Sequence, residues 1–230
     1  PKYDFSFEGH PNNTTYDHLK TLFEVGFRRV SFGIQDFDPV VQKAINRLQP
    51  AENVEQVTRW AREIGYESVN YDLIYGLPFQ NKLGIEKTMQ FVEAYKPDRI
   101  AFYSYAHVPW TSPGQRAYSE EHLPTGIEKR ALNQLGQKLL KQLGYVSMGM
   151  DHFALPNDEM TKAALNGTLK RNFMGYTVSN TKAMLGLGVS SISDLGFGYA
   201  QNVKSVEGYM DKVKQGLIPV FKGHFNTEKE

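Results

Sequence analysis

The feature that most constrains the fold is a junction that the sequence repeats three times. A helical stretch ends at a glycine, an aromatic residue follows, and an apolar segment begins. The glycines are Gly26, Gly65 and Gly144. Glycine readily adopts the left-handed conformation that ends a helix. A helix, a glycine and an apolar strand form the second half of a β–α–β unit, so the pattern predicts an α/β fold with parallel strands.

Periodicity places the other elements. Buried strands are predicted at residues 5–8, 29–35, 68–75 and 99–106, and helices at 15–25, 39–45, 51–64, 85–94, 127–143 and 203–214. Pro109, Trp110 and Pro113 then interrupt the alternation. We therefore expect a run of βα units over residues 1–107, a different region lining a site over 108–200, and a helix with a truncated tail over 201–230.

Three predicted strands end on or near a polar residue: Glu8, Gln35 and Asp72. In a barrel of alternating strands and helices, the carboxyl ends of the strands form the active face, so these side chains are expected to converge. Two carboxylates and an amide suit a ligand with an amino group or ribose hydroxyls. The alternative is local: Glu8 caps the next helix, and Asp72 pairs with a nearby cation.

Composition excludes several classes of function. The net charge of +1 argues against a general nucleic-acid-binding protein. No apolar run is long enough to span a bilayer. The chain contains no Cys, and its histidines lack metal-ligand spacing, so we assign it no metal site. The absence of Cys is compatible with a cytoplasmic protein.

Cationic groups elsewhere are candidates for anion binding. Arg47 follows a predicted helix, where an isolated Arg is commonly solvated. His152 and Arg171 could bind an acidic ligand. His152 could instead be a partly buried histidine with its hydrogen bonds satisfied.

Several strings together resemble the oxygen-independent coproporphyrinogen III oxidases of the radical S-adenosylmethionine superfamily. They are SFGIQDF at 31–37, NRLQ at 46–49, DLIYGLP at 72–78, YAHVP at 105–109, GMDHFA at 149–154, RNFMGYT at 171–177, GLGVSSIS at 186–193 and YAQN at 199–202. The resemblance runs from about residue 5 to residue 202.

This resemblance implies part of an open (β/α)6 partial TIM-type barrel, with an irregular α+β extension after the last barrel strand. It implies two cofactors, S-adenosylmethionine and a 4Fe–4S cluster. The implied S-adenosylmethionine contacts are Glu8, Gln35, Arg47, Asp72, Ala106 and Ile192. A second S-adenosylmethionine of the family would lie near Arg47 and Ile192, and Met174 stands where the family has Gln. Because the chain has no Cys, the cluster ligands are expected upstream of residue 1.

The implied activity is oxidative decarboxylation of coproporphyrinogen III to protoporphyrinogen IX in haem biosynthesis, through a 5′-deoxyadenosyl radical. Residues 1–230 alone are expected to be inactive, and no catalytic residue is assigned within them. The implied partners are the tetrapyrrole, which His152 and Arg171 would bind, and an electron donor such as flavodoxin or ferredoxin, with a monomeric, cytoplasmic protein. Three alternatives stay open: a radical enzyme with another substrate, a haem chaperone, and a barrel scaffold whose Glu8, Gln35 and Asp72 point away from a common pocket.

Overall fold

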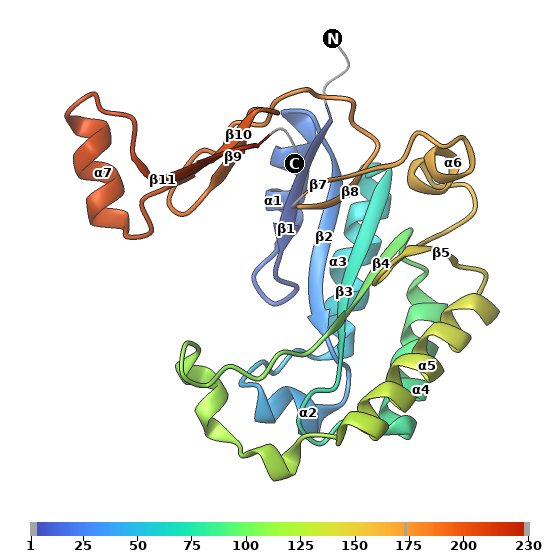
Figure 1. The fold of residues 1–230 in the computed structure, drawn as a ribbon. Helices are drawn as coiled ribbons and strands as arrows, with labels where there is room; N and C mark the ends of the chain where they lie inside the picture. Colours follow the sequence, from blue (N-terminus) through green and yellow to red (C-terminus); the bar gives the residue numbers. More distant parts are fainter. Residues whose placement is uncertain (1–3, 173, 228–230) are drawn as a thin grey trace. The chain divides into compact units, whose positions relative to one another are not determined.

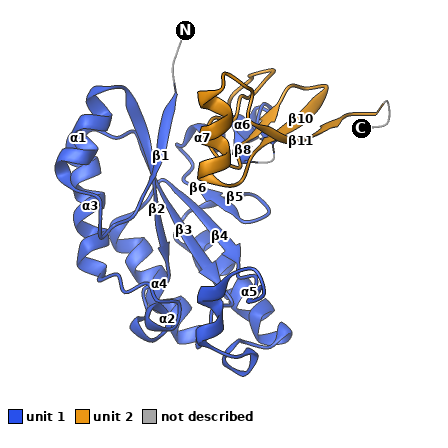
Figure 2. Ribbon diagram, turned by 90° about the vertical axis from the view of Figure 1, so that its left-hand side faces the viewer, with its two compact units in different colours: residues 1–178 blue, residues 179–230 orange. Residues whose placement is uncertain are grey.

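The computed structural model describes residues 4–172 and 174–227. The chain forms two compact units, Pro1–Val178 and Ser179–Glu230, which are coloured separately in Figure 2 and are described separately below. Of the motif at 171–177, Phe173 lies outside the described residues.

The first unit is built on a sheet of six strands (Figure 1). In spatial order they are β1 (Phe5–Gly9), β2 (Phe27–Gln35), β3 (Ser68–Tyr75), β4 (Arg99–Ser104), β6 (His152–Ala154) and β5 (Val146–Gly149). The first four strands are parallel, whereas β6 runs antiparallel to both β4 and β5. The predicted α/β class with a mostly parallel sheet is therefore confirmed. A short hairpin of β7 (Lys170–Asn172) and β8 (Gly175–Thr177) completes the unit's strands among the described residues.

The α-helices of this unit begin at side-chain caps, except for the helix over Ala51–Ile64, whose N-cap Pro50 makes no side-chain hydrogen bond. They are α1 (Tyr16–Glu24), α2 (Pro39–Ala44), α3 (Ala51–Ile64), α4 (Lys82–Tyr95), α5 (Gly126–Gln142) and α6 (Glu159–Leu165), with 3-10 turns η1 (Pro113–Ala117) and η2 (Glu120–His122). Thr15 caps α1 by accepting a hydrogen bond from the backbone N–H of His18, so the cap is not Glu8. Helix α4 begins earlier than the expected residue 85, because the side chain of Asn81 caps it.

The repeated glycine junctions end their helices as predicted. Gly26, Gly65 and Gly144 have φ values of 111°, 105° and 89°, which lie in the left-handed region that glycine adopts without a steric penalty. Each then leads into a segment of the sheet or its edge. The confirmed junctions explain why helix and strand alternate over the first half of the chain.

Alternate residues of the central strands face opposite sides. Val30, Phe32 and Ile34 of β2 are buried in the main hydrophobic core, as are Val69, Tyr71 and Leu73 of β3. Helices supply the rest of this core, with Leu19, Val54, Ile85 and Leu132 among its members. The opposite side carries Arg29, Ser31 and Gly33 of β2 and Ser68, Asn70 and Asp72 of β3, so this side is polar.

Strand β4 ends at Ser104, so the expected strand over residues 99–106 is two residues too long. Beyond Ser104, side chains donate hydrogen bonds to the next two backbone carbonyls. The Nζ of Lys129 donates to the carbonyl of Tyr105 at 2.5 Å, and the Nε2 of Gln115 donates to the carbonyl of Ala106 at 3.2 Å.

The second unit is a small α+β module. Its strands β9 (Ile192–Asp194), β10 (Gly198–Asn202) and β11 (Val220–Phe225) form an antiparallel sheet, and α7 (Val206–Lys214) connects β10 to β11. The helix begins at Val206 instead of the expected residue 203, because Ser205 caps it. The expectation of a tail without a further element is wrong, because β11 pairs with β10 along its length.

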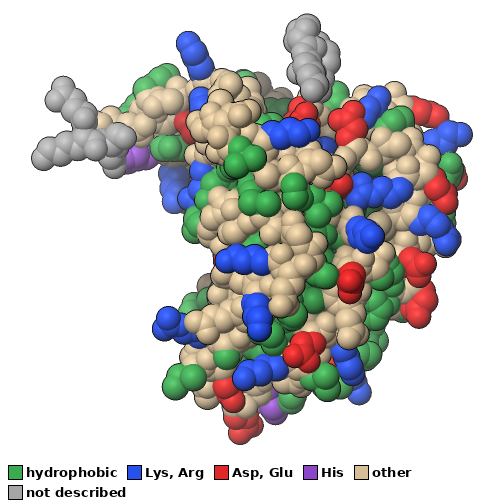
Figure 3. All heavy atoms as spheres, turned by 90° about the vertical axis from the view of Figure 1, so that its right-hand side faces the viewer, with side chains coloured by type: hydrophobic (Ala, Val, Ile, Leu, Met, Phe, Trp, Pro, Cys, Tyr) green, Lys and Arg blue, Asp and Glu red, His purple; other side chains and the backbone are tan. Residues whose placement is uncertain are grey.

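Figure 3 shows the face of the molecule toward which α4, α5 and α6 lie, and Lys, Arg, Asp and Glu side chains are interspersed on it. This mixed surface agrees with a net charge of +1 and shows no single basic patch on that face. Among the described residues, no helix has the length and apolar character required to cross a membrane.

Candidate functional site

The polar side of the first unit's sheet encloses a cavity of about 710 Å³. Strands β1 to β4 and β6 line it, together with Met174 and Tyr176. Its polar and charged lining consists of Ser6, Glu8, Arg29, Ser31, Ser68, Asn70, Asp72, Arg99, Tyr103 and His152. A closed barrel usually fills this volume with branched apolar side chains, whereas these residues leave it open to a polar ligand.

Asp72 is held by its neighbours on the inner face. The hydroxyl of Ser31 donates to its Oδ2 at 2.9 Å, and the amide of Asn70 donates to its Oδ1 at 3.0 Å. Burial raises the pKa of Asp72, these two hydrogen bonds lower it, Glu8 raises it and Arg47 lowers it. The hydrogen bonds of Asp72 come from neutral donors, and the charge of Arg47 acts on it from nearby, although no ion pair joins Asp72 to a cation among the described residues.

Glu8 and Asp72 both line the cavity, as expected, although Asp72 lies in the middle of β3 and not at its end. Strand register places Glu8 beside Ser31, and Ser31 beside Asn70. Glu8 is exposed and lies close enough to raise the pKa of Asp72. The scaffold alternative required these carboxylates to point away from a common pocket, and the structure contradicts it for these two.

Arg47 and Gln35 converge on Gly33, which is paired with Asp72 in the sheet. The Nη2 of Arg47 donates to the carbonyl of Gly33 at 2.6 Å. A Cβ atom on Gly33 would lie 2.9 Å from the Nε2 of Gln35 and 3.0 Å from the Nη2 of Arg47. The absence of a side chain at Gly33 thus creates the space in which the amide and the guanidinium meet.

The guanidinium of Arg47 is half-buried rather than solvated. Burial lowers its pKa, and the charge of Asp72 raises it. Its Nε is buried and has no hydrogen-bond partner among the described residues. A buried donor without an acceptor is unfavourable, so this atom marks a position where a ligand acceptor would be stabilised.

His152 also lines the cavity, with its Nε2 atom 3.5 Å from the hydroxyl of Tyr103. Its Nδ1 is buried without a partner among the described residues, so the expectation of a fully satisfied histidine is wrong. Burial lowers the pKa of His152, Asp151 raises it and Arg171 lowers it. The imidazole is therefore favoured in its neutral form, with a nitrogen available to a ligand.

Gln35 and Arg47 are not among the residues that line this cavity, and three other candidates also lie outside the lining. Arg171 is exposed on β7, with its Cζ 6.0 Å from the ring centroid of Tyr176. Ala106 is exposed just after β4. Ile192 belongs to the second unit, where it pairs with Gln201 across β9 and β10.

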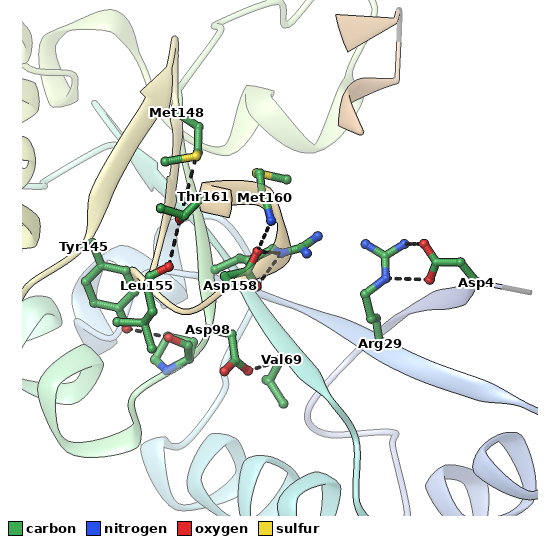
Figure 4. A network of polar contacts seen from close by, with 12 residues as sticks. Asp4, Arg29, Val69, Asp98, Tyr145, Met148, Leu155, Asp158, Met160 and Thr161 are labelled. Atoms are coloured by element: carbon green, nitrogen blue, oxygen red, sulfur yellow. Dashed lines mark hydrogen bonds and ion pairs between the residues drawn. The ribbon is translucent and has the colours of Figure 1, made fainter. Parts of the chain in front are cut away.

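Sequence reasoning missed most of the inner polar residues. Ser31 and Asn70 stand within their strands, Tyr103 stands one residue before the end of β4, and all three line the cavity. Their signal was the alternation within each strand, because residues two positions apart share a face. Arg29 and Arg99 were missed for the same reason. Both are ion-paired, with Asp4 and Asp158, and Figure 4 shows Asp4, Arg29 and Asp158.

The donor set suits a zwitterionic nucleoside better than a metal. Two carboxylates can bind an amino group or paired hydroxyls, and Arg47 and Gln35 can bind a carboxylate or a carbonyl oxygen. Within residues 4–172 and 174–227, no group of His, Cys, Asp or Glu side chains is arranged to hold a metal ion. The whole chain contains no Cys, so it offers no thiolate to an iron–sulfur cluster.

Comparison with known proteins gives consistent matches. The profile of the radical SAM superfamily matches residues 2–92. Anaerobic coproporphyrinogen III oxidase 1 of Cereibacter sphaeroides is 41% identical over 228 residues, which are 99% of this chain and 50% of that protein. The oxygen-independent coproporphyrinogen III oxidase of Helicobacter pylori is 42% identical over 220 residues, covering 96% of this chain and 48% of that protein.

A solved structure is similar over nearly the same span. Coproporphyrinogen III oxidase HemN from Escherichia coli, described as a radical SAM enzyme, superposes with a TM-score of 0.93 at 40% identity. The match covers 96% of this chain and 51% of that chain. The chain thus spans about half the length of these relatives.

Proposed function

We propose that this chain is the part of an oxygen-independent coproporphyrinogen III oxidase that binds S-adenosylmethionine and the tetrapyrrole. The premise is that the chain belongs to that family of the radical SAM superfamily. The proposed reaction of the whole protein is oxidative decarboxylation of coproporphyrinogen III to protoporphyrinogen IX in haem biosynthesis. The observation that carries the proposal is the cavity that Glu8 and Asp72 both line, together with the unpartnered Nε of Arg47, whose charge lowers the pKa of Asp72.

In this proposal the carboxylates of Glu8 and Asp72 bind the amino group and the ribose hydroxyls of S-adenosylmethionine. The amide of Gln35 and the guanidinium of Arg47 bind its carboxylate or adenine edge, and the backbone of Ala106 contacts the adenosyl group. The support is the donor set, in which negative and positive groups stand side by side around Gly33.

The substrate's propionates are the proposed ligands of His152 and Arg171. A neutral imidazole donates one hydrogen bond to a carboxylate, and the exposed guanidinium of Arg171 adds a positive charge nearby. When bound, S-adenosylmethionine would supply the radical chemistry of the reaction. Around it, the chain's own residues bind, orient and exclude water.

Residues 1–230 contain no Cys, so they offer no thiolate ligands to the 4Fe–4S cluster. The finer architecture is also a proposal: residues 1–107 contribute βα units to a partial (β/α)6 barrel, and residues 108–200 line its active site. An electron donor such as flavodoxin or ferredoxin, a monomeric state and a cytoplasmic location complete the proposal.

The test is a calorimetric titration of the full natural chain with S-adenosylmethionine. Asp72→Asn and Glu8→Gln are expected to weaken binding about tenfold each, since a charge-assisted hydrogen bond contributes about 1.5 kcal/mol or more. Glu67→Gln, at an exposed position outside the cavity, is the control. Unchanged affinity in both variants would refute the assignment.

Product analysis tests the reaction itself. Anaerobic incubation of the full natural chain with reductant, S-adenosylmethionine and coproporphyrinogen III is expected to release CO2 and protoporphyrinogen IX. Tight haem binding without decarboxylation would favour a chaperone instead. Decarboxylation by residues 1–230 alone would contradict the expectation that they are inactive.

A further inference from the structure

The side chain of Gln42 is buried beneath the proposed cofactor site, and all its hydrogen-bonding groups are used. Its Oε1 accepts from the backbone N–H of Gln49 at 2.9 Å. Its Nε2 donates to the carbonyl of Gln49 at 2.8 Å and to the carbonyl of Asp36 at 2.9 Å. The amide therefore pairs with Gln49 as a neighbouring β-strand would, and joins that residue to the end of β2.

The segment between Gln42 and Gln49 is a short excursion that carries Arg47. The backbone N–H of Arg47 donates to the carbonyl of Gln42 at 2.8 Å, which closes the turn after α2. The preceding residue, Asn46, has a φ of 53°, a left-handed conformation that Asn adopts more readily than most residues with a side chain. The conformation that directs Arg47 toward Gly33 thus depends on both ends of the excursion being held.

The other end of the Gln42 bridge holds Gln35. Asp36 is fully buried and follows Gln35 directly, and Gln35 has a φ of 69°. The Asp36 carbonyl accepts from Gln42, and its carboxylate accepts from the Nε2 of Gln80. One amide therefore fixes the backbone beside Gln35 and the backbone that carries Arg47, the two side chains that meet over Gly33.

We infer that Gln42 is a positioning residue for the pair Gln35 and Arg47, and that it sets their geometry without touching the ligand. This inference rests on the proposed function, because it assigns a purpose to a residue beneath the proposed S-adenosylmethionine site. It predicts that affinity for S-adenosylmethionine depends on a side chain that lies outside the cavity lining.

The test compares Gln42→Met with the wild type in the full natural chain, by calorimetric titration with S-adenosylmethionine. Met preserves the length of the side chain and removes all three hydrogen bonds. The expected result is affinity lower by roughly tenfold or more, since small displacements of binding groups have large effects. Gln137→Met is the matched control. Gln137 lies on α5, and within the described part of the chain its Nε2 donates only to the side chain of Asn133 on the same helix.

A double-mutant cycle with Arg47→Ala separates positioning from general destabilisation. If Gln42 acts through Arg47, Gln42→Met has little further effect on affinity in the Arg47→Ala background. Equal effects in both backgrounds, or wild-type affinity in Gln42→Met, would overturn the inference. If Arg47→Ala alone leaves affinity unchanged, the proposed cofactor site fails, and that failure is visible before Gln42 is considered.

Hydrogen exchange in the wild-type protein provides a measurement that does not depend on a variant folding. The backbone amide of Gln49 is expected to exchange slowly, because the side-chain Oε1 of Gln42 accepts its hydrogen bond. Exchange as fast as that of the exposed segment around Gly114 would show that the bridge does not hold the excursion, and the inference would be wrong.

Discussion

The carboxylate of Asp36 accepts a hydrogen bond from the Nε2 of Gln80 at 2.6 Å, and Asp36 has no exposed surface. The pair links the end of β2 to the turn after β3, because the Oε1 of Gln80 also accepts from the backbone N–H groups of Gly76 and Leu77. Among the described residues, no cation forms an ion pair with this carboxylate. Burial therefore raises the pKa of Asp36 from 3.8 to about 6, against hydrogen bonds that lower it.

This pKa predicts a pH-dependent contribution to stability. The folded state holds the proton more tightly than the unfolded state, so the contribution of Asp36 is largest below pH 3.8 and is lost as pH rises through about 6. An Asp36→Asn variant cannot ionise. Its free energy of unfolding, relative to wild type, is expected to rise by about 3 kcal/mol between pH 3.5 and pH 7.

Urea unfolding of both proteins across this range measures the difference. The lost hydrogen bond to Gln80 shifts the variant by the same amount at every pH, so only the slope is diagnostic. A difference that stays constant with pH would show that Asp36 titrates normally.

Gly33 provides a second prediction, on binding. Gly33→Ala places a Cβ atom against the Gln35 amide and the Arg47 guanidinium, and both must move away. Because these atoms end flexible side chains, the free energy of unfolding is expected to change by no more than about 1 kcal/mol. Affinity for S-adenosylmethionine should fall about tenfold. Calorimetry measures it, and Gly114→Ala, with open space around its Cβ position, is the control.

Gly136 and Gly126 offer a matched pair on the same helix. A Cβ at Gly136 would lie 2.4 Å from a ring carbon of Phe102 on β4, whereas a Cβ at Gly126 meets nothing within 4 Å. Gly136→Ala is expected to destabilise the protein by about 1–3 kcal/mol through overpacking, and Gly126→Ala to leave it unchanged or slightly more stable. Equal unfolding midpoints in urea for the two variants would mean that α5 does not pack on β4 as closely as the structure shows.

Among the ion pairs of the described residues, the pair between Arg99 and Asp158 is the most buried, with side-chain exposures of 10% and 6%. The Nε of Arg99 lies 2.9 Å from both carboxylate oxygens of Asp158, which also accepts from the backbone N–H of Met160 (Figure 4). Asp158→Asn keeps an acceptor and leaves the guanidinium without a counter-charge, so a loss of about 3 kcal/mol is expected.

The comparison for this prediction is the exposed pair of Arg59 and Glu63 on α3, at 3.7 Å. Glu63→Gln should change the free energy of unfolding by less than about 0.5 kcal/mol, because solvent screens an exposed pair. Similar losses at the two sites, measured by chemical denaturation, would contradict the distinction.

Local rules explain what the sequence predicted well. Gly26, Gly65 and Gly144 end helices because only a left-handed residue is needed there, and that preference belongs to glycine itself. Glu8 and Asp72 were found because strand ends in a parallel sheet share one edge. The bounds of α4 and α7 were missed by a few residues, although Asn81 and Ser205 are recognisable caps.

Contacts between distant segments explain what it predicted poorly. The alternative of a solvated Arg47 was reasonable from sequence, because nothing near it in the chain shows that its guanidinium meets the carbonyl of Gly33, 14 positions away. The strand at Val220–Phe225 depends on pairing with β10, and its own residues give a weak signal. The ion pair of Arg99 could not be predicted from its neighbours in the sequence, because its partner Asp158 lies 59 positions away.

The alternation of the central strands separates two kinds of selection on this protein. On β2, Val30, Phe32 and Ile34 belong to the hydrophobic core, while Arg29 and Ser31 line the cavity on the opposite side. Substitutions at the second set change what the cavity recognises with little loss of packing on the helical side. A chain built in this way can acquire new ligand specificities over evolutionary time through single replacements at every other residue, while the remaining residues keep it folded.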